Sequence, residues 1–102
     1  MNEKLTDIKQ NTAVLFERVN EYKQELKGDI YYIYQELSII LNDILRELKK
    51  YEKVNFLTIE TLRKMYNYLF VMFKIFTLSH LKIDCYNLIL DIYTILQESD
   101  EK

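Results

Sequence analysis

The sequence has no proline, no tryptophan and a single glycine, Gly28, among its 102 residues. Strands that fold back on one another need Gly, Pro or Asn-Gly turns, so this scarcity disfavours a multi-stranded sheet. The phosphate-binding loops of P-loop and dinucleotide-binding enzymes need two or three glycines close together, which excludes both classes. Helices joined by short polar links need few such residues, and the composition therefore favours an all-α fold.

Cysteine is equally scarce, since Cys85 is the only one in the chain. One cysteine allows neither an intramolecular disulfide nor a cysteine-based zinc site, and secreted chains of this size more often carry an even number. The N-terminal segment MNEKLTDIKQ contains Glu3 and Asp7 and is followed by no apolar run, unlike a signal peptide. We therefore expect a reducing, cytoplasmic location.

Neither sign of charge dominates the chain. Its 14 Lys and Arg residues oppose 16 Asp and Glu residues, which gives a small acidic protein with a net charge of -2. Such a chain has no long-range positive field to draw it to phosphate or anionic lipid, so we expect no direct nucleic-acid partner and no more than peripheral contact with membranes. The length fits a single domain, residues 1–102, with one hydrophobic core.

Apolar side chains that recur every three or four residues predict four amphipathic helices. These helices cover about residues 3–27, 30–53, 59–78 and 85–98. We expect Gly28 to end the first helix and Asp29 to cap the second. Thr58 and Asp84 are expected to cap the third and fourth. The pattern predicts an all-α, antiparallel four-helix bundle.

The same spacing predicts the face that each helix buries. The stripe of the first helix is Leu5, Ile8, Leu15, Val19, Tyr22 and Leu26, with Thr12 filling the one gap. The stripe of the second is Ile30, Ile33, Leu37, Ile40, Ile44, Leu48 and Tyr51. The stripe of the third is Ile59, Leu62, Tyr66, Leu69, Phe73 and Phe76. The fourth is expected to bury Cys85, Leu88 and Ile92.

An alternative layout makes residues 3–53 one unbroken helix. The steps from Tyr22 through Leu26 to Ile30 then form a stutter in a continuous heptad pattern. Such a helix would dimerise as a coiled coil, with a helical hairpin over residues 58–98 folded against it. We favour two helices because glycine inside a helix costs about 1 kcal/mol relative to alanine.

The least charged stretch is NYLFVMFKIFTLSH, residues 67–80. A membrane-spanning helix needs about 20 mostly apolar residues, whereas Asn67 and Lys74 divide this stretch and fall on the polar side of a helical wheel. We therefore predict an amphipathic core helix here.

Some apolar residues fall on the predicted polar faces, where a monomeric bundle would place charge. Clusters of exposed apolar side chains mark contact surfaces for other proteins. We predict that four of them contact a partner protein, namely Tyr32, Ile39, Phe70 and Val71. The alternative is that a neighbouring helix covers them.

The sequence offers little chemistry for catalysis. His80 is the only histidine, and it is expected in the turn between the third and fourth helices with Asp84 four residues on. Only Ser79 or Cys85 could complete a triad, and a solvated loop histidine is the simpler interpretation. We expect Cys85 to be a small buried apolar residue.

A metal centre is not indicated either. Glu17, Glu21 and Glu25 share one helix face, but a metal site in a helical bundle needs inward-facing Glu-x-x-His pairs, and the sequence has none. We therefore expect no catalytic residues, no metal, no cofactor and no enzymatic activity.

Three segments suggest a family. ILNDILRELKKYEK (residues 40–53), LRKMYNYLFVMFK (62–74) and the turn LKID (81–84) are followed by an apolar final helix. Over residues 40–98 this order resembles the small immunity proteins that protect lactic-acid bacteria against their own pediocin-like (class IIa) bacteriocins. The resemblance implies an antiparallel four-helix bundle in the cytoplasm that recognises the bacteriocin-occupied sugar-transporter receptor at the membrane.

Three functional hypotheses follow. The leading one is a non-enzymatic binding protein that neutralises or blocks a partner protein by stoichiometric contact, either as a bacteriocin immunity protein or as a phage-type inhibitor of a host defence protein. The second is a structural homodimer joined through the coiled coil of residues 3–53. The third is a membrane-surface protein that uses the Phe70 side of the third helix, which the acidic balance disfavours.

Overall fold

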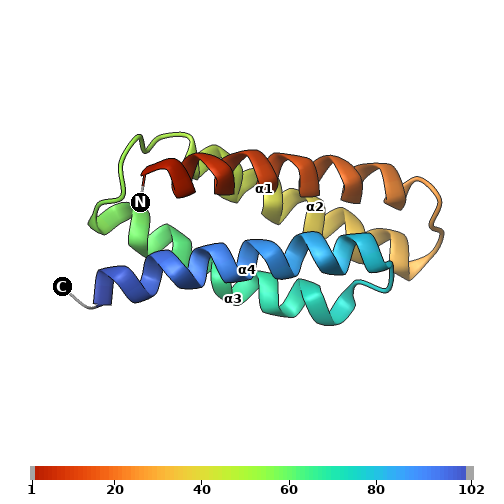
Figure 1. Cartoon of the computed structure of the whole chain (residues 1–102). Helices are drawn as coiled ribbons and strands as arrows, with labels where there is room; N and C mark the ends of the chain where they lie inside the picture. The colour runs from red at the N-terminus through yellow and green to blue at the C-terminus, as the bar shows by residue number, and fades with distance from the viewer. Residues whose placement is uncertain (1, 101–102) are drawn as a thin grey trace.

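The computed structural model describes residues 2–100 and shows four helices over them, with no strand in that range. They are α1 (Asn2–Lys23), α2 (Asp29–Leu48), α3 (Phe56–Ile75) and α4 (Ser79–Asp100). Successive helices run in opposite directions, and the start of α1 and the end of α4 lie at the same end of the molecule (Figure 1). The predicted all-α, antiparallel four-helix bundle is confirmed.

The helices form a square in which each one packs against its two neighbours. α1 lies against α2 and α4, and α3 lies against the same two helices, while the backbones of the diagonal pairs do not come close in the described part of the chain. The bundle measures 46 × 23 × 18 Å, with its long axis along the helices. Each link is short and joins two helices that are antiparallel neighbours, which is the up-down-up-down topology of four-helix bundles.

The chain reverses direction between α1 and α2, so the continuous helix over residues 3–53 is wrong. After Lys23, the amides of Glu25 and Leu26 donate to carbonyls three residues earlier, at 3.0 Å each, which tightens and ends the helix. Gly28 follows with φ 72° and ψ −148°, a backbone conformation that is essentially restricted to glycine. α1 therefore ends at residue 23 instead of 27.

The N-cap position of α2 is Gly28, not Asp29 as predicted. Asp29 is the first residue of the helix, and no side chain caps this end by a hydrogen bond. A carboxylate in the first turn still interacts favourably with the positive end of the helix dipole. The other end of α2 is at Leu48 instead of 53, because the amides of Lys50 and Tyr51 bond to carbonyls three residues back.

The start of α3 lies three residues before the predicted one. The cap is Asn55, whose side-chain oxygen accepts a hydrogen bond from the Thr58 amide at 3.0 Å. Thr58, the predicted cap, is instead buried inside the first turn and donates its hydroxyl to the Lys53 carbonyl at 2.8 Å. Asparagine is as good an N-cap by residue type as threonine, and Asn55 lies three residues before the Thr58 amide that donates to it.

The start of α4 lies six residues before the predicted one, at Ser79 instead of 85. The reason is that Leu81 is completely buried, so the first turn packs into the core and is held in helical form. Asp84 is therefore not a cap. It lies within α4 and accepts a hydrogen bond from Arg18 of α1. The stretch 67–80 is divided between α3, a short link and the start of α4, and none of the described helices has the length and apolar character that crossing a bilayer requires.

The core matches most of the stripe predicted for the first helix, in which Tyr22 and Leu26 are only partly buried, and it differs more from that of α2. Leu5, Ile8, Leu15 and Val19 are fully buried or nearly so. In α2, however, Ile30 and Ile33 are exposed, and the buried set is Tyr34, Leu37, Ser38, Leu41, Ile44, Leu45 and Leu48. The ring of Tyr34 lies 5.3 Å from that of Tyr22 and 5.9 Å from that of Phe76, and so occupies the core position assigned to Ile33.

The buried face of α3 is also rotated from the predicted one. Met65 and Met72 are buried at 0% and 1% exposure, whereas Tyr66 and Phe73 are only partly buried. Methionine fills irregular core space readily because its side chain is flexible. The two aromatic rings are thereby displaced towards the junction with α4.

Candidate functional site

α4 has two apolar faces. Its inner face belongs to the core and consists of Leu81, Cys85, Leu88, Ile92 and Ile95, all 0% exposed. Its outer face carries Ile83, Tyr86, Leu90 and Tyr93, which are between 45% and 58% exposed. Their spacing of three, four and three residues returns to one side of a helix. Core packing needs only the first face, so the second is available for another contact.

α3 supplies the facing wall of a groove. Tyr66, Phe70 and Phe73 follow one another at steps of four and three residues and lie on the side of α3 next to α4. The groove encloses about 330 Å³ and is lined almost wholly by apolar atoms. We call it the α3–α4 groove. It is lined by Tyr66, Phe70, Phe73, Tyr86, Ile89, Leu90 and Tyr93.

Aromatic contacts across the groove hold its walls together. Across the groove, the ring of Tyr66 stacks on that of Tyr93 at 6.5 Å, and within α3 it meets the ring of Phe70 edge to face at 4.9 Å. At the other end, the rings of Phe73 and Tyr86 are 6.3 Å apart. Ring pairs at these separations attract one another and limit side-chain motion. The groove is therefore largely formed before any ligand arrives, which lowers the entropic cost of binding.

Basic groups flank the end of the groove near Phe73. The Lys82 ammonium lies 4.4 Å from the centroid of the Phe73 ring and donates a hydrogen bond of 2.8 Å to the Phe73 carbonyl. That carbonyl is one of the last in α3, where helical partners are lacking. Lys74 is exposed and follows Phe70 by four residues, which places it on the same side of α3.

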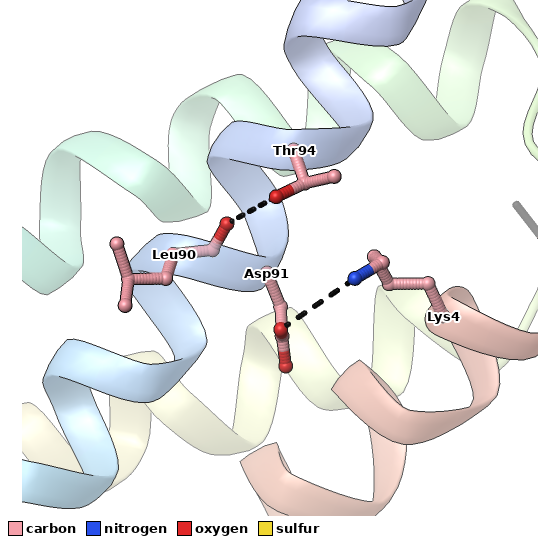
Figure 2. A network of polar contacts seen from close by, with 4 residues as sticks. All are labelled: Lys4, Leu90, Asp91 and Thr94. Carbon is pink, nitrogen blue, oxygen red and sulfur yellow. Dashed lines mark hydrogen bonds and ion pairs between the residues drawn. The ribbon is translucent and has the colours of Figure 1, made fainter.

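The acidic groups of α4 point away from the groove and towards α1. Asp84 pairs with Arg18, and an Asp91 oxygen lies 3.9 Å from the Lys4 ammonium. Figure 2 shows the second pair, with the Leu90 side chain pointing away from it. The Thr94 hydroxyl donates to the Leu90 carbonyl at 2.9 Å. Acidic and apolar side chains are thus segregated onto different sides of α4.

The four residues predicted to contact a partner are all exposed, but the structure does not bring them together. Phe70 lines the α3–α4 groove, whereas Val71 lies about 100° further round α3. Tyr32 and Ile39 belong to α2, which lies diagonally across the bundle from α4. Their role in binding stays a prediction, and only Phe70 belongs to the groove.

The sequence interpretation missed the α4 wall of the groove. Placing the start of the last helix at residue 85 excluded Ile83 and hid the row that continues through Tyr86, Leu90 and Tyr93. The signal was nevertheless present, because apolar residues at steps of three, four and three indicate a second helical stripe.

The residues considered for catalysis do not form a reactive group. His80 lies in the first turn of α4, not in a loop, and borders a polar hollow with Arg18, Glu21 and Glu25. Cys85 is completely buried, and its thiol donates to the Leu69 carbonyl at 3.1 Å. Burial raises the pKa of the Cys85 thiol to about 12, so it stays protonated and weakly nucleophilic at neutral pH. Across residues 2–100, no three His, Cys, Asp or Glu side chains gather as metal ligands would.

Comparison of the chain with family models, with curated proteins and with solved structures finds no match. The resemblance to bacteriocin immunity proteins therefore stays a hypothesis that depends on the three sequence segments alone.

Proposed function

We propose that this chain is a non-enzymatic binding protein that neutralises or blocks a partner protein by stoichiometric contact, and that the partner binds in the α3–α4 groove. The observation that supports this is the second apolar face of α4, opposite the aromatic rings of α3. Tyrosine and other aromatic residues are enriched at protein interfaces and supply a large share of the binding energy. Three of the seven groove residues are tyrosines.

The form of the groove favours a protein over a small molecule. Small-molecule sites combine a concave pocket with a few polar groups that orient the ligand. Here the lining contains no charged and no amide side chain. The exposed row from Ile83 to Tyr93 is also about 15 Å long, roughly three helical turns, which suits an elongated partner segment.

Two biological settings are compatible with the proposal, both in the cytoplasm. In one, the chain is a bacteriocin immunity protein. In the other, it is a phage-type inhibitor of a host defence protein. Both require a tight contact surface and no reaction, so the groove serves either equally well.

The proposal is tested with a double substitution on the outer face of α4, Tyr86→Glu with Leu90→Lys. Because both side chains are exposed, the helical circular dichroism and thermal midpoint should hold. In a pull-down from candidate host cells, the native chain should retain a protein that the double variant loses. Titration of that purified protein should give one partner per chain.

A matched control makes the same kind of change on α2, Tyr32→Lys with Ile39→Glu. These residues are exposed to a similar degree but lie away from the groove. The control should retain the partner. If it loses the partner while the α4 variant keeps it, the binding surface is on α2 and the proposed groove is wrong. If the retained protein proves to be chemically altered by the chain, the non-enzymatic assignment is wrong.

A further inference from the structure

We infer that the α3–α4 groove takes an amphipathic helix whose apolar stripe is bordered by carboxylates, with these carboxylates at the Lys74 and Lys82 end. The inference rests on the proposed function and names the chemistry of the partner segment. Three features support it: the charge around the groove, the routing of acidic groups to α1, and the length and spacing of the apolar row.

The charge at one end of the groove is positive. Lys82 is fixed there by the Phe73 ring and carbonyl, and only one of its three N–H donors is used in that hydrogen bond. Lys74 stands on the adjacent turn of α3. Two ammonium groups beside an apolar surface favour a ligand with carboxylates next to its apolar stripe.

Among the described side chains of α4, no carboxylate lies at this end of the groove to offset the positive charge. Asp84 and Asp91 pair with α1, and Glu98 follows Asp91 by seven residues on the same side of the helix. On α3, Glu60 precedes Phe70 by ten residues, about 15 Å along the axis. A chain with a net charge of -2 therefore presents a basic end to this groove.

The spacing of the apolar residues fits a helix better than an extended strand. Ligand helices bind in grooves through apolar residues at positions i, i+3 or i+4, and i+7, over two to three turns. Tyr66, Phe70 and Phe73 repeat this spacing on one wall, and Tyr86, Leu90 and Tyr93 repeat it on the other. A bound strand gains affinity by pairing with free backbone N–H and C=O groups of the protein. The helices on both walls of the groove already use these groups in their own hydrogen bonds, so they offer a strand none.

A second copy of the chain is a poorer occupant. It would bring the same apolar row, but Asp84 and Asp91 of that copy pair with its own α1 and point away from the row, so it offers no acidic border to the two lysines. An anionic lipid surface would match the lysines, but a flat bilayer surface would not fill the recess of about 330 Å³ between α3 and α4. The acidic amphipathic helix satisfies both the charge and the shape.

The test uses two synthetic peptides of about five helical turns with an identical leucine and phenylalanine stripe. One has glutamates beside the stripe, and the other has lysines at the same positions. We expect the acidic peptide to bind in a one-to-one ratio, at least about tenfold more tightly than the basic one at low salt. Raising the salt concentration should narrow this difference because exposed charges are screened.

Charge reversal in the protein gives the sharpest comparison. The double variant Lys74→Glu with Lys82→Glu should bind the basic peptide more tightly than the acidic one. The matched control, Lys49→Glu with Lys50→Glu, makes the same change in net charge at exposed positions after α2 and should keep the native preference. Circular dichroism confirms that each variant keeps its helices.

Each other outcome has a definite meaning. Equal binding of both peptides overturns the charge preference while leaving the groove in place, and binding of neither overturns the helix as ligand. Tight binding of the acidic peptide that Leu90→Lys does not weaken would show that the proposed groove is wrong. Concentration-dependent sedimentation that Leu90→Lys abolishes assigns the groove to a second copy. Binding to phosphatidylglycerol vesicles that Leu90→Lys abolishes assigns it to lipid.

Discussion

Tyr34 is the largest side chain that the described part of the bundle buries completely, and it joins three helices. Its ring on α2 lies against Tyr22 of α1 and against Phe76 at the end of α3. Tyr32, two residues earlier, points out of the bundle and is 67% exposed. Residues two apart on a helix lie about 200° apart, so two similar tyrosines have opposite environments.

The substitution Tyr34→Ala should therefore be severe. It removes a fully buried ring and leaves a cavity, for which we expect a loss of about 3–5 kcal/mol in the free energy of unfolding. Tyr32→Ala is the matched control and should cost less than about 1 kcal/mol. Urea denaturation followed by circular dichroism measures both values. Similar losses at the two positions would mean that α2 is rotated from the orientation described.

At the level of the helices, Gly28 decides whether the chain forms two antiparallel helices or one long one. Its φ of 72° lies where side chains with a Cβ are strained, although an added Cβ would meet no atom within 4 Å. The cost of Gly28→Ala should thus come from the backbone alone, about 1–3 kcal/mol in the free energy of unfolding. Lys27→Ala, at the neighbouring exposed position, should change it by less than about 0.5 kcal/mol. An unchanged stability for Gly28→Ala would show that the turn does not need this conformation.

The number and order of the helices could be predicted from the sequence, because periodic apolar residues and scarce turn residues act locally. Most of the stripe of α1 was predictable for the same reason, since Leu5, Ile8, Leu15 and Val19 recur at helical spacing and are all buried. α2 offers apolar residues on several faces, and the choice of Tyr34 over Ile33 depends on contacts with Phe76 far along the chain. The start of α4 was mispredicted because Asp84 has the residue type of a cap but binds Arg18.

For the whole molecule, the packing order of the helices decides which exposed apolar residues can act together. α2 and α4 lie on a diagonal of the bundle, so Tyr32 and Ile39 cannot join the row on α4. Phe70 lines the same groove as that row because α3 and α4 are neighbours. A single sequence does not give the rotation of each helix in the bundle, which is why the predicted contact residues include only one member of the groove.

The assembled core also makes the free energy of unfolding depend on pH in the alkaline range. Burial raises the pKa of the Cys85 thiol on α4, from 9.0 to about 12, and also raises the pKa of the Tyr34 phenol on α2 above 10.0. Both groups are neutral in the fold, and the unfolded chain releases their protons more readily. Their contribution to stability is therefore complete below about pH 9 and is lost as the pH rises towards the folded-state values.

We expect Cys85 to cause no change in the urea midpoint between pH 6 and pH 8, and to lower the midpoint above pH 9. The thiol alone contributes a slope of up to about 1.4 kcal/mol per pH unit between pH 9 and its folded pKa of about 12. Cys85→Ala should remove that part of the slope, because alanine has no proton to release, and should leave the part due to Tyr34.

Thiol-specific alkylation of the native chain at pH 8 should be slow, because the Cys85 thiol is buried and protonated, and it should become fast on unfolding. If the native chain and Cys85→Ala show the same alkaline slope, and the thiol reacts quickly in the folded protein, then Cys85 is not enclosed between α3 and α4 and the packing described for this side of the core is wrong.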